Sequence, residues 1–246
     1  MSHDHTHAHE HFDRHRNPED FARYLVKLEG PDREAWQKPG RLIAALGLRP
    51  GDVACEVGAG PGYRTLRMAL AVGRRGVVHA IDVEPRMIEV LRLRAREAGV
   101  KNIRSILAKP GRGALPPRGC RLILIVNTFH HFPDGVAYLR RLASRLLPGG
   151  RIVNVDFHRR ELPVGPPIEH TVSRADFLAT AREAGLERIG ERRFLPYQYF
   201  LELAPVSASG RRGSAKAKGK ESSPSRSRPR IRRAPAAPRR AARSTR

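Results

Sequence analysis

The stretch Val53-Ala54-Cys55-Glu56-Val57-Gly58-Ala59-Gly60-Pro61-Gly62 decides the fold of this 246-residue chain. An apolar run of this length before glycines predicts a buried parallel strand. The glycines let the backbone turn tightly and approach a ligand closely, which a Cβ would block. A helical pattern begins at once, over 63–72, so the loop lies between a strand and a helix N-terminus. Proteins of the α/β class bind nucleotide-like ligands at such loops.

This loop departs from the dinucleotide-binding fingerprint G-x-G-x-x-G. Tyr63 stands where that fingerprint requires its third glycine. Glu56 ends the apolar run, and a carboxylate there suits a ligand with a positive charge or hydroxyls rather than a pyrophosphate. A second strand, expected over 76–82, ends in Asp82. An acid at this place is the usual partner of ribose hydroxyls.

These residues and later segments resemble the class I S-adenosylmethionine (SAM)-dependent methyltransferases. Glu56-to-Gly62 resembles the first motif of that family. The other segments that carry the resemblance, in chain order, are 80–87, 122–132, 147–156, 173–178 and 184–186. Their order and the His130-His131-Phe132 segment look most like the ubiquinone/menaquinone-biosynthesis type of small-molecule methyltransferase. The resemblance covers roughly residues 33–203.

The expected fold is an α/β, Rossmann-like doubly wound sheet of seven strands. It is mostly parallel, with an antiparallel C-terminal edge hairpin and helices on both faces. We predict strands over 53–57, 76–82, 103–107, 121–126, 151–156, 186–193 and 196–203. We predict helices over 63–72, 85–98, 134–147 and 174–184. Two N-terminal helices are expected, one from Asn17 to Lys27 and one from Pro31 to Gly47 that Pro39-Gly40 interrupts. In the family such helices often cover the cofactor or substrate, so Tyr24 and Trp36 are candidates to line the pocket; simple packing on the sheet is the alternative.

The resemblance implies that SAM binds at the strand ends. The implied binding residues are Glu56, Gly58, Ala59, Gly60, Gly62, Asp82, Val83 and Asn127. The glycines would let the backbone pass close to the methionine and ribose portions, and Glu56 would hold the methionine amino group, directly or through water. Asp82 would accept hydrogen bonds from the ribose hydroxyls and Val83 would flank the adenine. Asn127 would contact the methionyl part.

The catalytic residues are not identified by the sequence, although His130 and His131 are weak candidates. A histidine here could act as a general base on a hydroxyl acceptor, since its pKa lies near neutrality. The alternative is that one histidine packs and the other is solvated. The segment Asn127-Thr128-Phe129-His130 differs from Asn/Asp-Pro-Pro-Tyr/Phe. That difference argues against methylation of DNA adenine or protein glutamine, and leaves carbon, oxygen, a small amine, arsenic or sulfur open.

Two positions depart from the family pattern. The loop that begins at Ala108-Lys109 lacks the acid that often contacts the adenine amine, and Arg121 follows Cys120 where Asp-x-Val is usual. A non-catalytic SAM-binding pseudoenzyme is therefore one alternative to a small-molecule methyltransferase.

The formal charge of +23 is concentrated in a C-terminal tail. Residues 206–246 contain fourteen Lys/Arg and one acid, so we expect a disordered basic tail. Its charge could neutralise nucleic-acid phosphates without sequence preference, but it has no aromatic residue for base stacking. The competing hypothesis is thus a nucleic-acid-associated protein, either an RNA methyltransferase or a nucleoid-bound one. Weak, nonspecific contacts of the tail are the simpler interpretation.

The expected organisation is a His-rich disordered tail over 1–16, a methyltransferase domain over 17–205 whose N-terminal helices occupy 17–50, and the basic tail. Alternating histidines in the first tail could chelate a transition metal, but a solvated tail is the simpler interpretation, and we predict no metal site. The absence of a long apolar run or an apolar leader predicts no membrane insertion and no signal peptide. Two cysteines, Cys55 and Cys120, fit a reducing compartment. We therefore expect a cytoplasmic protein.

Overall fold

A seven-stranded sheet forms the centre of the fold, with the strand order β3-β2-β1-β4-β5-β7-β6. The computed structural model describes residues 21–30, 32–109 and 119–206. The His-rich tail, the predicted start of the first helix over 17–20, the loop over 110–118 and residues 207–246 of the basic tail fall outside the described residues. Strands β1 to β5 are parallel, and β7 runs antiparallel to both of its neighbours. The strands are β1 (Val53–Val57), β2 (Val77–Asp82), β3 (Ile103–Leu107), β4 (Cys120–Val126), β5 (Leu146–Phe157), β6 (Leu186–Arg192) and β7 (Gln198–Pro205).

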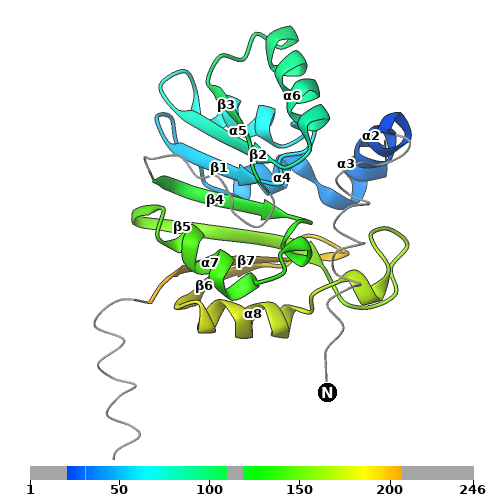
Figure 1. Ribbon diagram of the computed structural model, residues 1–246, viewed down its shortest axis with the longest axis vertical. Helices are drawn as coiled ribbons and strands as arrows, with labels where there is room; N and C mark the ends of the chain where they lie inside the picture. The colour runs from blue at the N-terminus through cyan, green and yellow to red at the C-terminus, as the bar shows by residue number, and fades with distance from the viewer. Residues whose placement is uncertain (1–20, 31, 110–118, 207–246) are drawn as a thin grey trace, which may run out of the picture. The chain divides into compact units, whose positions relative to one another are not determined.

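Helices cover both faces of this sheet, which confirms the predicted class (Figure 1). The apolar side chains of alternate strand residues bury against α4 (Pro39–Ala45) and α5 (Thr65–Val72) on one face. The residues between them bury against α7 (Gly135–Ala143) and α8 (Arg174–Glu183) on the other. Helix α6 (Pro85–Glu97) packs on β2 and β3 through Leu91. Strands β1 and β4 are buried on both faces, so their continuous apolar runs reflect their central place.

The predicted helix over 134–147 is too long, and the fifth strand is longer than expected. Helix α7 ends at Ala143, and β5 begins at Leu146. Leu146 pairs with Cys120 on β4, and the amide of Cys120 donates to the carbonyl of Arg145 at 2.8 Å. This pairing joins residues far apart in sequence, so the helical periodicity of 134–147 carries no sign of it.

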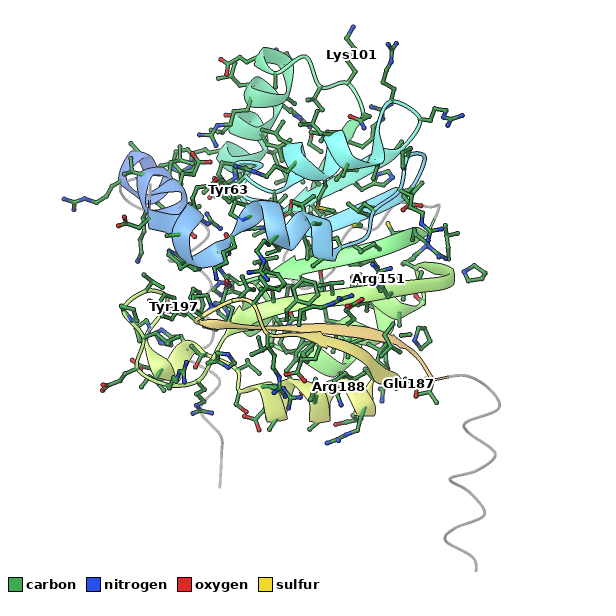
Figure 2. The ribbon with its side chains drawn as sticks, turned by 180° about the vertical axis from the view of Figure 1, so that it is seen from behind. Tyr63, Lys101, Arg151, Glu187, Arg188 and Tyr197 are labelled. Atoms are coloured by element: carbon green, nitrogen blue, oxygen red, sulfur yellow. The ribbon has the colours of Figure 1, made fainter. Side chains whose placement is uncertain are left out.

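From Phe21 onward, three short helices precede the sheet: α2 (Phe21–Glu29), α3 (Asp32–Gln37) and α4. Lys38 has φ 46° and separates α3 from α4, in agreement with the break expected at Pro39. Helices α2 and α3 lie beside the end toward which the β4 arrow points (Figure 1). In the reverse view, Tyr63 and Tyr197 lie toward this same end of the sheet, while Glu187 lies toward the opposite end (Figure 2).

Cys55 and Cys120 lie on the neighbouring strands β1 and β4 and are fully buried as free thiols. A hydrogen bond with Cys120 and burial raise the pKa of Cys55 well above its ordinary value. Both thiols therefore behave as small apolar side chains of the core. Across the described ranges, we find no helix with the length and apolar character needed to span a membrane.

Candidate functional site

A cavity opens at the carboxyl ends of β1, β2 and β4, where the parallel strands deliver their loops to one edge. The glycine loop and the ends of β2 and β4 form its floor, and α2 and α3 contribute its outer wall. The lining residues are Tyr24, Leu28, Arg33, Val57, Gly58, Ala59, Gly60, Pro61, Tyr63, Arg64, Ile81, Asp82, Val83, Glu84, Met87, Ala108, Lys109, Val126, Asn127, Thr128, His131, Phe132 and Tyr138.

The glycine loop requires glycine for two different reasons. Gly58 has φ 73°, and a Cβ there would lie 2.2 Å from Oγ1 of Thr128, so the loop touches the end of β4 at this point. Gly60 has φ 55°, and its Cβ position faces open space. Its amide donates to Oδ2 of Asp82 at 2.7 Å, which joins the loop to the end of β2. The loop is thus fixed from both sides before any ligand binds.

Asp82 presents a carboxylate to the cavity. Oδ2 accepts from the amide of Gly60, and Oδ1 accepts from the amide of Glu84 at 3.0 Å. Burial raises the pKa of Asp82 above its ordinary value, and these backbone N–H groups oppose that shift. An ionised carboxylate has about four acceptor sites, so Asp82 keeps capacity for hydroxyl donors of a ligand.

Glu56, at the end of β1, is fully buried and lies outside the cavity wall. Its Oε1 accepts from Nε of Arg64 at 2.7 Å, and its Oε2 accepts from Oγ1 of Thr65 at 2.5 Å. Thr65 begins α5 and Arg64 directly precedes it. Both oxygens of Glu56 are therefore engaged within the chain, and this carboxylate reaches the cavity only through Arg64.

Asn127 follows β4 in the left-handed conformation, with φ 54°. Its amide donates to the carbonyl of Val155, and its Oδ1 accepts from Nε2 of Gln198 at 2.5 Å. Gln198 begins β7 and is 1% exposed. Because its oxygen faces Gln198, the Nδ2 donor of Asn127 is the part of this amide left for another partner.

The two candidate histidines occupy different places, although they are adjacent in a short 3-10 helix (Phe129–His131). His131 lines the cavity, whereas His130 does not. Nδ1 of His130 lies 3.3 Å from Oδ2 of the fully buried Asp156, and the two imidazole rings are 4.1 Å apart. His130 therefore joins the cavity-lining His131 to a buried carboxylate.

The remaining wall is mostly apolar and aromatic. Phe132 stacks on Tyr138 with ring centroids 3.7 Å apart, and burial raises the pKa of the Tyr138 hydroxyl. Burial, and next the charge of Asp82, raise the pKa of Tyr24 from α2. Trp36 lies elsewhere, against Phe157 and Tyr197. Such a wall suits a ligand with a flat, apolar part.

The cavity brings together six of the eight residues predicted to bind the cofactor. These six are Gly58, Ala59, Gly60, Asp82, Val83 and Asn127, whereas Glu56 and Gly62 lie outside the wall. A Cβ on Gly62 would meet Leu91 at 3.1 Å, so this glycine serves the packing of α6 on the loop. Lys109 lines the cavity, but Arg121 lies at the far end of β4, where it donates to the carbonyl of Pro148.

Two arginines of the wall, Arg33 and Arg64, were missed by the sequence reasoning. Arg33 is 8% exposed and its Nε donates to Oε1 of Gln37, one helical turn later, at 2.6 Å. The four-residue spacing places Arg33 and Gln37 on one face of a helix, but it does not indicate that this face is buried. The partner of Arg64 is Glu56, eight residues earlier, which no local pattern indicates.

Comparison with known proteins finds a matching family, described as a methyltransferase domain, over residues 54–150. Aklanonic acid methyltransferase from Streptomyces sp. (strain C5) is 34% identical over 129 residues, which cover 52% of this chain and 59% of that protein. The 27-O-demethylrifamycin SV methyltransferase of Amycolatopsis mediterranei is 30% identical over 161 residues, which cover 60% and 58%. This chain thus spans less than two thirds of the length of either relative.

The expected likeness to the ubiquinone/menaquinone type is also found. The ubiquinone/menaquinone biosynthesis C-methyltransferase of Vibrio vulnificus (strain YJ016) is 28% identical over 151 residues, which cover 61% of this chain and 56% of that protein. Among solved structures, a SAM dependent methyltransferase from Aquifex aeolicus superposes with a TM-score of 0.70 and 24% identity, over 74% of this chain and 97% of that chain. At this identity the structural similarity concerns the fold.

Proposed function

We propose that this chain is a class I SAM-dependent methyltransferase that transfers a methyl group from SAM to a small-molecule acceptor bound in the cavity; its similarity to a methyltransferase domain over residues 54–150 supports this. The observation that carries this proposal is the placement of the glycine loop, Asp82 and Asn127 around one cavity beneath α2 and α3. The names of two relatives, which act on aklanonic acid and on 27-O-demethylrifamycin SV, support an acceptor of small-molecule size.

The residues of the wall fit SAM. Asp82 keeps acceptor capacity for the ribose hydroxyls, and the apolar side chains of Val83 and Met87 would flank the adenine. Gly58, Ala59 and Gly60 would let the backbone approach the ribose and methionine portions, and Asn127 would offer its Nδ2 to the methionyl part. We propose that Glu56 supports Arg64 and the start of α5 instead of binding the methionine amino group itself.

SAM supplies a methyl group that its sulfonium has already activated for in-line displacement. The tasks left to the chain are to orient the acceptor and to exclude water, and correct placement can supply much of the rate. Tyr24 and Leu28 of α2 cover the cavity from outside. Phe132 and Tyr138 offer a flat apolar surface for the acceptor.

A hydroxyl acceptor must lose its proton during transfer, and we propose that His131 receives it. His131 is the histidine of the wall, and a positioned general base contributes about 10²- to 10⁴-fold to a rate. His130 is a positioning residue in this scheme, because its ring packs against that of His131 at a tilt of 54° and its Nδ1 lies 3.3 Å from Asp156. The alternative for both side chains is packing alone.

The experiment has two steps. Calorimetric titration of the full chain with SAM first measures donor binding. Label transfer from methyl-labelled SAM is then screened over phenols, quinols, carboxylic acids, thiols and amines, with tRNA and duplex DNA in parallel. We expect label on a small acceptor, and a kcat lower by about 10²- to 10⁴-fold in His131→Ala with unchanged SAM affinity. Label that appears only on nucleic acid, and disappears when residues 207–246 are removed, would contradict the proposal.

A further inference from the structure

Arg33 is a buried cation in the cavity wall, and it has no acid as a partner in the described part of the chain. It lies on α3 and is 8% exposed. Its Nε donates to the neutral Oε1 of Gln37, and its guanidinium carbon lies 4.5 Å from the ring centroid of Tyr63. Burial foremost, and then the charge of Arg64, lower the pKa of Arg33 to about 9. A cation buried in this way costs stability unless an anion joins it.

Glu56 and Glu29 attract Arg33 at longer range and oppose the fall of its pKa, but neither forms an ion pair with it. Glu56 forms its ion pair with Arg64, and Glu29 pairs with Arg94 of α6. Gln37 uses its single oxygen for both Arg33 and Arg64, at 2.6 and 3.4 Å. Its own Nε2 is buried and has no hydrogen-bond partner within the described ranges. Among the described residues, the outer wall of the cavity therefore holds one buried cation without an ion-pair partner and, next to it, one unpaired donor.

We propose that Arg33 forms a carboxylate-binding subsite of this cavity. Its guanidinium nitrogens would bind a carboxylate group of a molecule held there. The proposal rests on the proposed function, because that function places ligands in the cavity. One planar guanidinium held against an aromatic ring matches the flat, singly charged carboxylate and can bind both of its oxygens. The carboxylate has two sources, the methionine end of SAM or an acid group of the acceptor.

Arg67 provides a matched control for Arg33. Its guanidinium carbon lies 4.4 Å from the centroid of the same Tyr63 ring. Arg67, however, donates to Oε1 of Glu34 at 2.8 Å, has a 38% exposed side chain and does not line the cavity. Arg67→Gln therefore removes the same chemical group from the same ring without removing the cation of the cavity.

The test compares two ligands that differ at the amino-acid end. S-adenosylhomocysteine and 5′-methylthioadenosine share adenosine and a thioether, but only the first has the carboxylate. Both are titrated calorimetrically into the full-length wild type, Arg33→Gln and Arg67→Gln. If the donor supplies the carboxylate, Arg33→Gln weakens S-adenosylhomocysteine by about 10- to 100-fold and changes methylthioadenosine by less than about twofold. Arg67→Gln leaves both affinities within about twofold.

A second arm identifies an acceptor carboxylate. Benzoate is titrated into protein saturated with S-adenosylhomocysteine. Unchanged S-adenosylhomocysteine binding in Arg33→Gln, together with loss of a benzoate affinity that the wild type shows, assigns the carboxylate to the acceptor. Equal affinities of wild type and Arg33→Gln for all three probes would overturn the subsite.

Two further readouts separate binding from folding. A ligand-binding Arg33 costs stability in the free protein, so the melting temperature of Arg33→Gln is unchanged or higher without ligand. A lower melting temperature, with methylthioadenosine affinity lost as well, would make Arg33 structural and overturn the subsite. None of these readouts needs a turnover assay. Failure to find a small-molecule acceptor would therefore count against the proposed function and leave the result for Arg33 intact.

Discussion

Glu56 and Asp82 end neighbouring parallel strands, one helix apart in the chain, yet the structure uses their carboxylates in opposite ways. Both oxygens of Glu56 are bonded to side chains at the start of α5, and the residue is fully buried. Asp82 is held only by backbone amides, and it faces the cavity. The difference arises from the neighbours. Arg64 and Thr65 reach back to Glu56, whereas no side chain among the described residues bonds to the carboxylate of Asp82.

The comparison separates an acid that stabilises the fold from an acid that is available for a ligand. A buried carboxylate that pairs with a buried guanidinium leaves a large penalty when one partner is removed. A carboxylate whose pKa is raised by burial is itself disfavoured in the folded state, and a ligand with hydroxyl donors can offset that cost. A variant at Glu56 should therefore mainly lower stability, and a variant at Asp82 should mainly lower ligand affinity.

The largest expected effect is on stability, in Glu56→Gln. This change leaves the buried Arg64 without its counter-charge, so the free energy of unfolding falls by about 3–5 kcal/mol, measured by urea denaturation. The matched control is Glu34→Gln, which removes the exposed partner of Arg67 and costs less than about 1 kcal/mol. A Glu56→Gln protein with wild-type stability and strongly weakened S-adenosylhomocysteine binding would reverse the assignment of the two acids.

The next effect is on affinity, in Asp82→Asn. Loss of the charged acceptor weakens S-adenosylhomocysteine by about 100-fold, or about 2.7 kcal/mol, because hydrogen bonds to ionised groups are the strong ones. Unfolding stability changes by less than about 1 kcal/mol, since the charged form of Asp82 was disfavoured by burial. The control is Asp52→Asn, which precedes the other end of β1 and accepts from the amide of Arg49. Equal losses of affinity in both variants would show that Asp82 acts only through the fold.

The raised pKa of Asp82 also predicts a pH dependence. Its folded-state pKa lies above the unfolded value, so between the two the folded state binds more protons, and this contribution to stability declines as pH rises through that window. Ligand hydroxyls need the ionised form, so affinity for S-adenosylhomocysteine falls as pH drops below the raised pKa, by at most tenfold per pH unit. Titrations in Asp82→Asn should lose this dependence; a slope that persists in the variant would assign it to another group.

Much of the fold could be predicted from the sequence because its signals are local. The apolar runs of β1, β3 and β4 mark strands that match the predicted bounds within one residue. The predicted helix over 174–184 agrees with α8 within one residue, and Ser173 caps its start by accepting from the amide of Asp176. The prediction that Leu146 is helical was wrong. Leu146 lies in a strand because it pairs with Cys120, which is far away in sequence.

The site divides in the same way. The glycine loop and Asp82 could be placed from sequence, because parallel strands bring their ends to one edge of a sheet. The ion pair of Glu56 could not be predicted, since an acid before glycines gives the same sequence pattern whether or not an arginine binds it. Arg33 could not either, because its exposure depends on how α3 packs over the cavity. Sequence patterns predict where strands end better than they predict the partners of charged side chains.

The smallest effect extends the comparison to the third strand end, where Asn127 is bonded on one side only. Gln198→Leu removes the donor that holds Oδ1 of Asn127, and it also removes a buried Gln198 oxygen that has no partner in the described region. The two changes offset each other in stability, which should shift by less than about 1 kcal/mol. Affinity for S-adenosylhomocysteine falls roughly three- to tenfold, because the Nδ2 donor loses its fixed direction. Calorimetry on Gln198→Leu and on Gln198→Glu, whose carboxylate cannot donate to Oδ1, measures this effect. If both variants bind like the wild type, then the backbone bond from Asn127 to Val155 is enough to orient the amide, and Gln198 serves only packing.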